Sequence, residues 1–377
     1  MRVPFADLAA CHLEHARSFH EALDELLASS AFIGGQAVAD FEREFAAACG
    51  ARHAVGCANG TDALHASLRA LGIGAGMAVV TVANTFIATA EAISQTGAEV
   101  IFAEVGNDAG MDPASLAEVL ERHPRRDRIK CVLPVHLYGQ PADLPRIAAL
   151  AAAHGLPVLA DGAQAHGALI AGRPIAAQAA LTTFSFFPGK NLGALGDAGA
   201  IVCDDERQAA FLRGFCNHGR SDTDRHQHLV VGMNSRLDAL QAAFLRRKLA
   251  VLPEKTRRRQ EFARLYDRQL AELPEVERPP LLADRLSVFH LYVIRLDDRE
   301  TVAAELKKRG VETGYHYRTP LHLQPAYRFL GLQPGALPAT ERLAAHILSL
   351  PLYPEMTEEQ VEHVVTSLKE SLVRRGR

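Results

Sequence analysis

Short apolar runs alternate with longer amphipathic segments from about residue 50 to residue 205. The runs, which predict buried β-strands, cover residues 53–58, 78–82, 99–102, 129–135, 157–160, 182–186 and 200–202. The segments that predict helices in the same region cover residues 61–71, 86–95 and 144–154. Because strands alternating with helices form βαβ units, this region predicts an α/β fold with a mainly parallel sheet covered by helices on both faces.

The pattern changes after about residue 235. The later segments that predict elements are helices at 237–249 and 257–273, a strand at 288–295, a helix at 301–309, a β run near 313–317 and two last helices. Between them, residues 274–285 are rich in Pro, Glu and Arg, which is typical of a linker. We therefore predict a large α/β domain over residues 1–250, with a helical N-terminal segment, and a small C-terminal α+β domain over residues 251–377.

The composition agrees with a soluble two-domain protein. The 377 residues are 48% hydrophobic and 23% charged, with a net charge of -3. Arg257, Arg258 and Arg259 fall on a polar helical stretch and are predicted to form a solvent-exposed face. Nucleic-acid binding is disfavoured because no basic stripe or recognition motif accompanies them.

The sequence also disfavours a membrane protein, a secreted protein and a metalloprotein. It contains no apolar run of 18 residues, and its N-terminus lacks the apolar core of a signal peptide. The 6 cysteines are scattered without a CxxC pair, which predicts reduced thiols in a cytoplasmic protein. Among the 17 histidines there is no HEXXH motif, and His226 and His228 stand in a polar loop without an evident third ligand. We predict no metal site.

The first motif with possible chemistry is a turn between the strand at 53–58 and the following helix. Gly60 allows a tight turn there, and the helix that starts at Thr61 and Asp62 offers free N–H groups and a positive dipole end, which suits a phosphate. An ordinary helix cap is the alternative, because Thr and Asp are good cap residues.

The second motif is Asp161, which directly follows the apolar run at 157–160. This position is the carboxyl edge of the predicted sheet, where open α/β folds bind their ligands. A helix N-cap is the alternative role.

The third motif surrounds Lys190, which lies in an apolar and glycine-rich segment. Burial lowers the pKa of a lysine and makes its amine nucleophilic at neutral pH. The segment is not a phosphate-binding Walker loop, because Asn191 stands where that loop has Ser or Thr.

The three motifs together are more specific than any one of them. A phosphate-binding turn comes first, a carboxylate at a strand end follows, and a lysine comes after it. This order is typical of enzymes that bind pyridoxal 5′-phosphate (PLP) as a lysine Schiff base with an acidic partner for the pyridine nitrogen.

The chain also resembles a known family over nearly its whole length. The segments that carry the resemblance are GTDAL at 60–64, TFIATAEAI at 85–93, DGAQAHGA at 161–168, SFFPGKNLGALGD at 185–197, VGMNSRLDALQAAFL at 231–245 and HYRTPLHLQPAY at 316–327. They are similar to the sugar aminotransferases of the DegT/DnrJ/EryC1/StrS family, a group with fold type I and PLP as cofactor. The resemblance implies a transferase of that fold that passes through pyridoxamine 5′-phosphate.

The resemblance also implies roles for single residues. Lys190 would bind PLP covalently, Asp161 would pair with the ring nitrogen, and Gln164 would contact the ring hydroxyl side. Phe86 would stack on the ring. The residues implied around the phosphate are Gly60, Thr61, Asp62 and Ser185, together with Asn234 from a neighbouring subunit.

A contribution from a neighbouring subunit would make a homodimer the functional unit. His316, Tyr317 and His322 are expected near the sugar. Gly189 and Ala198 depart from the residues common in the family, and these departures affect the local shape of the site rather than its catalytic groups.

The implied reaction is transfer of an amino group from L-glutamate to a nucleotide-linked ketosugar. Ser235 after Asn234 resembles members that act on a 3-keto sugar, and a 4-keto sugar is the alternative position. An aminocyclitol aminotransferase remains open as another substrate class. A PLP-dependent dehydratase is disfavoured because such relatives carry His in place of the lysine, and the intact Asp161, Gln164 and Lys190 disfavour a regulatory protein.

Overall fold

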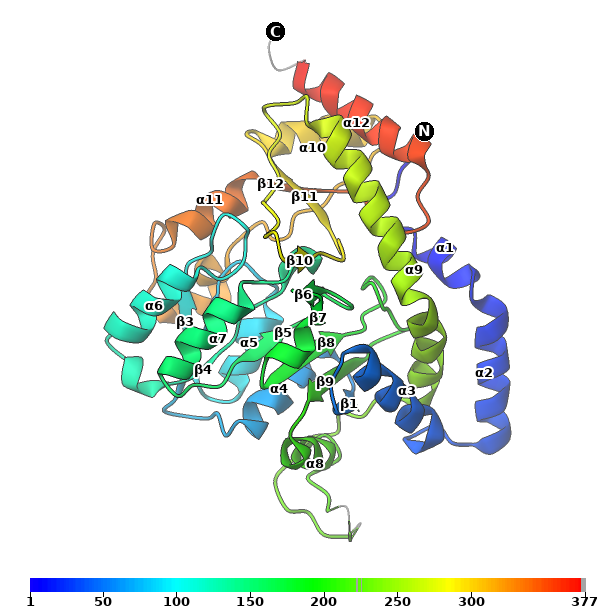
Figure 1. Cartoon of the computed structure of the whole chain (residues 1–377), viewed down its shortest axis with the longest axis vertical. Coiled ribbons are helices and arrows are strands. Elements are labelled where there is room, and N and C mark those ends of the chain that lie inside the picture. Colours follow the sequence, from blue (N-terminus) through cyan, green and yellow to red (C-terminus); the bar gives the residue numbers. More distant parts are fainter. Residues whose placement is uncertain (222, 225, 374–377) are drawn as a thin grey trace.

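A computed structural model describes residues 1–221, 223, 224 and 226–373 (Figure 1). Its central sheet contains, in spatial order, β3 (Glu99–Ala103), β2 (Ala78–Val82), β4 (Ile129–Val132), β5 (Leu159–Asp161), β8 (Leu181–Ser185), β9 (Gly199–Cys203) and β1 (His53–Cys57). Parallel bridges from Val132 to Val158 and from Val135 to Asp161 connect β4 to β5. Only β9 runs against its neighbours, so the prediction of a mainly parallel sheet is confirmed.

Helices pack on this sheet because its strands are apolar on both faces. All five residues of β2 are buried, as expected for a strand with helices on both sides. The helices of this part are α3 (Gly35–Ala48), α4 (Gly60–Ala70), α5 (Ala88–Gln95), α6 (Pro113–Arg122), α7 (Leu144–Ala153) and α8 (Glu206–Phe215). Short strands β6 (Leu169–Ile170), β7 (Arg173–Pro174) and β10 (Arg285–Leu286) form a small separate sheet.

The C-terminal part has a hydrophobic core of its own, around Tyr266, Tyr292 and Val361. Its elements are the antiparallel pair β11 (Tyr292–Arg295) and β12 (Ile347–Leu350), with α10 (Arg299–Lys308), α11 (Pro338–His346) and α12 (Glu358–Val373). The β run expected near 313–317 is not a named strand, because Gly314 makes only an isolated bridge to Ser349.

One long helix connects the two cores. We predicted separate helices at 237–249 and 257–273, but α9 (Ala239–Leu270) is a single helix of 32 residues that contains Pro253. The predicted division at residue 250 falls inside this helix, so the division into two domains stays a prediction.

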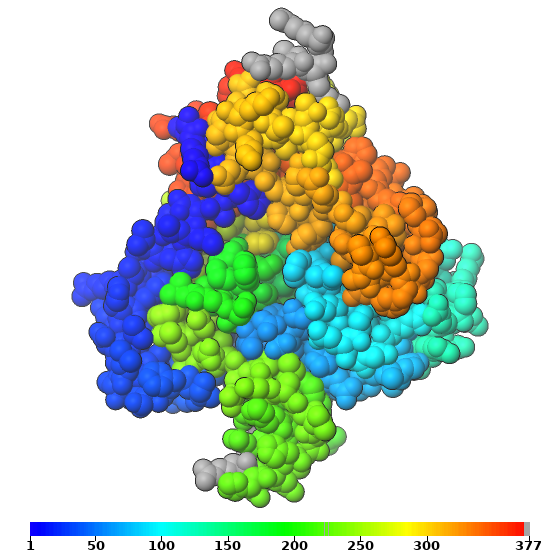
Figure 2. All heavy atoms as spheres, turned by 180° about the vertical axis from the view of Figure 1, so that it is seen from behind, coloured from blue at the N-terminus to red at the C-terminus, as the bar shows by residue number. Residues whose placement is uncertain are grey.

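Two further segments lie at the periphery. Helices α1 (Leu8–Leu13) and α2 (Ala16–Ser29) belong to the N-terminal helical segment, and α2 packs along α9 (Figure 1). The segment between α8 and α9 projects from the body of the molecule (Figure 2). It exposes Leu229, Val230 and Val231, the last of them 95% exposed. No described helix has both the length and the apolar character to cross a membrane.

Candidate active site

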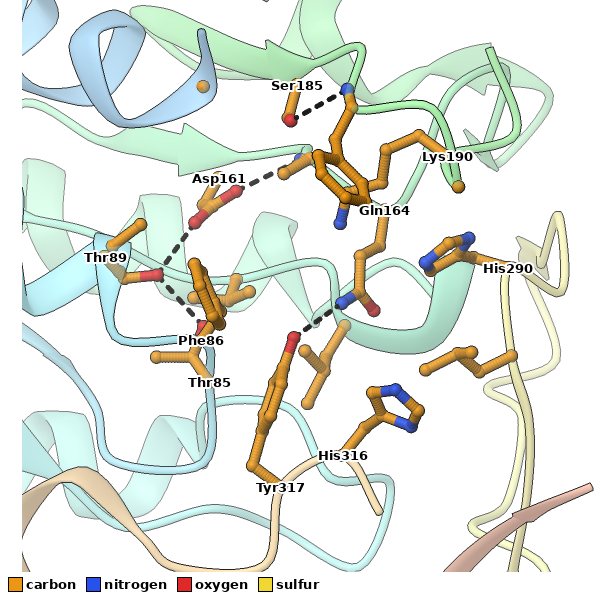
Figure 3. A pocket seen from close by; sticks show the side chains of 18 of the residues that line it. Thr85, Phe86, Thr89, Asp161, Gln164, Ser185, Lys190, His290, His316 and Tyr317 are labelled. Atoms are coloured by element: carbon orange, nitrogen blue, oxygen red, sulfur yellow. Dashed lines mark hydrogen bonds between the residues drawn. The ribbon is translucent and has the colours of Figure 1, made fainter. Parts of the chain in front are cut away.

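A cavity of about 520 Å³ lies at the carboxyl ends of the central strands. Several of the residues predicted from the sequence line it together, namely Gly60, Thr61, Phe86, Asp161, Gln164, Ser185, Lys190, His316 and Tyr317. They come from segments that are far apart in the chain. Figure 3 shows the side chains of Phe86, Asp161, Gln164, Ser185, Lys190, His316 and Tyr317 around the same space.

Asp161 is the last residue of β5 and is 5% exposed. Its Oδ1 accepts a hydrogen bond from the Ala163 backbone N–H at 3.0 Å, and its Oδ2 accepts one from the Thr89 hydroxyl at 2.8 Å (Figure 3). Burial raises the pKa of this carboxyl, while the two hydrogen bonds and the charge of Lys190 oppose the rise. The carboxylate is therefore fixed in orientation and turned toward the cavity.

Lys190 follows the turn after β8 and extends into the same cavity (Figure 3). Its backbone N–H bonds to the Phe187 carbonyl at 2.8 Å, which closes the turn. Burial lowers the pKa of the lysine to about 8, and Asp161 opposes this shift. An amine with this pKa is neutral in about one molecule in ten at pH 7, far more often than an ordinary lysine, so it can act as a nucleophile or accept a proton.

The N-terminus of α4 forms one end of the cavity. Asn59 caps this helix by accepting a hydrogen bond from the Asp62 N–H at 2.8 Å. Among the described residues, the backbone N–H groups of Gly60 and Thr61 have no hydrogen-bond partner, so both can bind an anion. A Cβ at Gly60 would lie 2.6 Å from the Cβ of Ser185, so the helix can approach β8 this closely only with glycine.

Gln164 is held from both sides. Its Oε1 accepts a hydrogen bond from the Tyr138 N–H at 2.7 Å, and its Nε2 donates to the Tyr317 hydroxyl at 3.2 Å (Figure 3). The Tyr138 hydroxyl donates in turn to the His316 carbonyl at 2.6 Å. This network connects the sheet edge to the segment at 316–317.

Aromatic rings form another wall of the cavity. Phe86 is more than half exposed, and its ring centre lies 5.9 Å from that of Tyr317. His316 stacks on Phe5 at 5.6 Å, and its Nδ1 bonds to the Ser349 hydroxyl at 2.8 Å. Burial and the charge of Lys190 lower the pKa of His316 to about 4, so its ring is neutral at physiological pH.

Three of the predicted site residues do not line the cavity. Asp62 is not a lining residue, although Gly60, Thr61 and Leu64 of the same helix are. His322 is 1% exposed, and its Nε2 bonds to Glu341 at 3.0 Å. Asn234 pairs with Asn217 in the projecting segment. The geometry gives no support to a sugar contact for His322, which stays a prediction.

A protein-family comparison agrees with this geometry. The model of the DegT/DnrJ/EryC1/StrS aminotransferase family matches residues 14–369. The chain belongs to the DegT/DnrJ/EryC1/StrS aminotransferase family.

Individual proteins are similar to the chain over nearly its full length. The erythromycin biosynthesis sensory transduction protein EryC1 of Saccharopolyspora erythraea is 42% identical, over 98% of this chain and 99% of the relative. The dTDP-3-amino-3,4,6-trideoxy-alpha-D-glucose transaminase of Streptomyces venezuelae is 40% identical, over 98% and 96% of the two chains. The crystal structure of S. venezuelae DesV with a ketimine intermediate is 40% identical, covers 98% of both chains and superposes with a TM-score of 0.94.

The chain is therefore a PLP-dependent sugar aminotransferase with fold type I. The cavity of this DegT-family member offers the groups that such a cofactor needs, since it combines a partly buried amine, a buried carboxylate and a helix N-terminus with unpaired N–H groups. In the part of the chain that the structure describes, no group of three His, Cys, Asp or Glu side chains is placed to hold a metal ion.

Sequence reasoning missed several residues of this aminotransferase site. Thr89 on α5 bonds to Asp161, and Thr85, just before that helix, bonds to Thr89 at 3.0 Å. Their spacing of four residues was the available signal. His290 lines the cavity and bonds to the Asn191 side chain at 3.1 Å. Arg259 lines it as well and is 8% exposed, so the prediction that it lies on a solvent-exposed face is wrong.

Proposed function

We propose that this aminotransferase moves an amino group from L-glutamate to C-3 of a nucleotide-linked ketosugar and releases an aminosugar. The observation that carries the proposal is the convergence of Lys190 and Asp161 on one cavity that is large enough for a small substrate beside the cofactor. The name of the S. venezuelae relative, a 3-amino sugar transaminase, supports the position on the sugar. A 4-keto sugar and an aminocyclitol precursor are the alternative acceptors.

Each cavity residue has a part in this proposal. When bound, PLP accepts the electrons that a substrate carbon releases and carries the amino group between the two substrates. Lys190 would be the attachment point. Once free, its amine would remove the proton from the donor Cα in the first half of the reaction and would deliver a proton to the acceptor carbon in the second half. The negative charge of the Asp161 carboxylate would favour the protonated form of the ring nitrogen.

The other residues position the cofactor and the substrate. Gln164 would hold the ring hydroxyl, and Phe86 would cover one face of the ring. The N–H groups of Gly60 and Thr61 and the Ser185 hydroxyl would bind the phosphate, and Asp62 belongs to the same helix end. His316 and Tyr317 would contact the sugar.

The functional unit in this proposal is a homodimer in the cytoplasm. Asn234 does not line the cavity of its own chain, and it lies in a segment whose apolar residues Leu229, Val230 and Val231 are exposed. An exposed apolar patch of this kind favours a protein partner. A second copy of the chain would bury the patch and could bring Asn234 to the neighbouring phosphate site.

The proposal is tested with a panel of nucleotide-linked 3-keto and 4-keto sugars and a cyclitol ketone, each offered with L-glutamate. We expect release of 2-oxoglutarate with a 3-keto sugar, and no release with a Lys190→Ala variant. Borohydride reduction of the holoenzyme followed by peptide mass analysis should place the cofactor label on Lys190. Turnover of the cyclitol ketone alone, or a label on another lysine, would contradict the proposal.

A further inference from the structure

Arg259 is a buried cation in the wall of the active-site cavity. It lies in the middle of α9, directly after Arg257 and Arg258, and it lines the same cavity as Lys190 and His290. It is 8% exposed, whereas Arg257 is exposed on the same helix. Of the three arginines, only Arg259 lines the cavity, and it also lines a smaller neighbouring cavity with Lys190 and Glu355.

Backbone carbonyl groups hold one side of its guanidinium. The Nη1 of Arg259 donates to the carbonyl oxygens of Phe289, His290 and Leu352 at 3.3, 3.4 and 2.7 Å. These carbonyls belong to two separate segments of the C-terminal part. The side chain is thus fixed in direction by neutral groups, without a carboxylate in contact with it.

The other side of the guanidinium is unpaired. Among the described residues, Nε and Nη2 of Arg259 have no hydrogen-bond partner, and no carboxylate lies within 4.0 Å of the side chain. Neither atom is among the fully buried unpaired nitrogens, so both retain some accessible surface. Glu355, whose charge acts on Arg259 from a longer distance, is paired with Lys255 at 3.1 Å.

A buried cation of this kind is costly unless an anion joins it. The guanidinium stays charged at neutral pH, and its planar Nε–Nη2 edge matches the two oxygens of a carboxylate. The unpaired N–H groups at the start of α4 already provide a separate place for the cofactor phosphate. The open edge of Arg259 is therefore available to a substrate anion.

We propose that Arg259 binds a carboxylate group of the amino donor. The inference rests on the proposed function, because it assigns a binding residue to the donor step of that reaction. His290 links the two side chains in space, since its carbonyl accepts from Arg259 at 3.4 Å and it lines the cavity together with Lys190. A donor bound at Arg259 thus lies on the side of the cavity where Lys190 acts.

The test measures binding to the holoenzyme of glutarate, a five-carbon dicarboxylate that has no amino group and cannot react. Arg259→Gln should weaken glutarate binding by about 10-fold or more in calorimetry, because it removes a charged hydrogen-bond donor. The matched control is Arg258→Gln. Arg258 also bonds to backbone carbonyls, those of Pro354 and Met356, but does not line the cavity. The affinity of the Arg258→Gln holoenzyme for glutarate should stay within about 2-fold of that of the wild type.

A second readout is loss of the yellow colour of the holoenzyme when L-glutamate is added. We expect the concentration of L-glutamate for half-maximal bleaching to rise in Arg259→Gln, while the KM for the sugar acceptor changes little. If Arg259→Gln loses its cofactor, Arg259→Lys decides, and it should weaken glutarate binding by about 3-fold or more because lysine lacks the planar two-donor edge.

Unchanged glutarate affinity in the folded Arg259 variant would overturn the inference. So would a loss that falls on the sugar nucleotide alone, which would assign Arg259 to a phosphate. Failure of wild-type holoenzyme to bleach with L-glutamate would instead contradict the proposed function, so the two failures can be told apart.

Discussion

At the scale of single residues, the site depends on keeping one carboxylate charged inside the protein. Burial raises the pKa of Asp161, and two hydrogen bonds oppose this rise. The Thr89 hydroxyl donates its hydrogen to Asp161, so the hydroxyl of Thr85 donates to Thr89. A chain of two hydroxyl groups, one just before α5 and one on it, therefore supports the anion.

Thr89→Val should make Asp161 harder to ionise. Without the hydroxyl donor the pKa of Asp161 rises further. In an acid titration the carboxylate therefore takes up its proton at a higher pH than in the wild type. We expect the acid limb of the kcat/KM profile to move up by about 1 pH unit, since a hydrogen bond to a charged group contributes about 1.5 kcal/mol or more. The control is Thr85→Val, which leaves the bond to Asp161 in place and should shift the limb less. Equal shifts in the two variants would contradict this role of Thr89.

The same scale shows what the sequence could and could not predict about the site. Lys190 and Asp161 were found because each follows an apolar run and stands near glycines, which is a local signal. Arg259 was not found, because its burial depends on carbonyls at 289, 290 and 352 that approach it only in the folded chain. Three consecutive arginines in a polar segment carry no information about which one turns inward.

At the scale of elements, the close contact of α4 with β8 shapes the phosphate end of the cavity. Gly60→Ala would place a methyl group against Ser185, and the chain would have to shift to accept it. We expect a loss of about 1–3 kcal/mol in the free energy of unfolding and weaker PLP binding.

The loss is measured by thermal unfolding and by titration of the apoenzyme with PLP. Gly74→Ala is the matched control, because its Cβ would meet atoms only at 3.7 and 3.8 Å, and its stability should change by less than about 0.5 kcal/mol. Normal PLP affinity in Gly60→Ala would show that the close contact is not needed.

The strands were predicted better than the later helices, for a physical reason. A strand buried on both faces is a continuous apolar run, and the run at 78–82 matches β2 residue for residue. The helix α9 was predicted as two helices, because residues 237–249 share an apolar face whereas the residues from 257 onward are highly charged. Packing of this helix against both cores keeps it continuous, and the local sequence does not reveal such packing.

At the scale of the whole molecule, the proposed homodimer shares its active sites. Lys190→Ala and Asn234→Ala chains, each inactive or weakly active alone, should regain activity when they are co-expressed. In a hybrid dimer one of the two sites then has both intact residues. The isolated hybrid should therefore reach about half of wild-type activity, and an equal, unseparated mixture about a quarter.

The measurement uses two different affinity tags to isolate the hybrid dimer. No recovery would mean that Asn234 serves the site of its own chain or no site at all. A mixture of two Lys190→Ala chains with different tags controls for effects of the tags.

The continuity of α9 constrains how the molecule can move. A helix of 32 residues is about 48 Å long, and the same rod is embedded in both hydrophobic cores. Swinging one core away from the other would bend this rod, and Pro253 is its weakest point because proline lacks the N–H that would tie it to the preceding turn. The two hydrophobic cores are thus expected to keep their relative orientation during turnover. Substrates are expected to enter past short peripheral stretches such as residues 5–8, of which Phe5, Ala6 and Leu8 line the cavity.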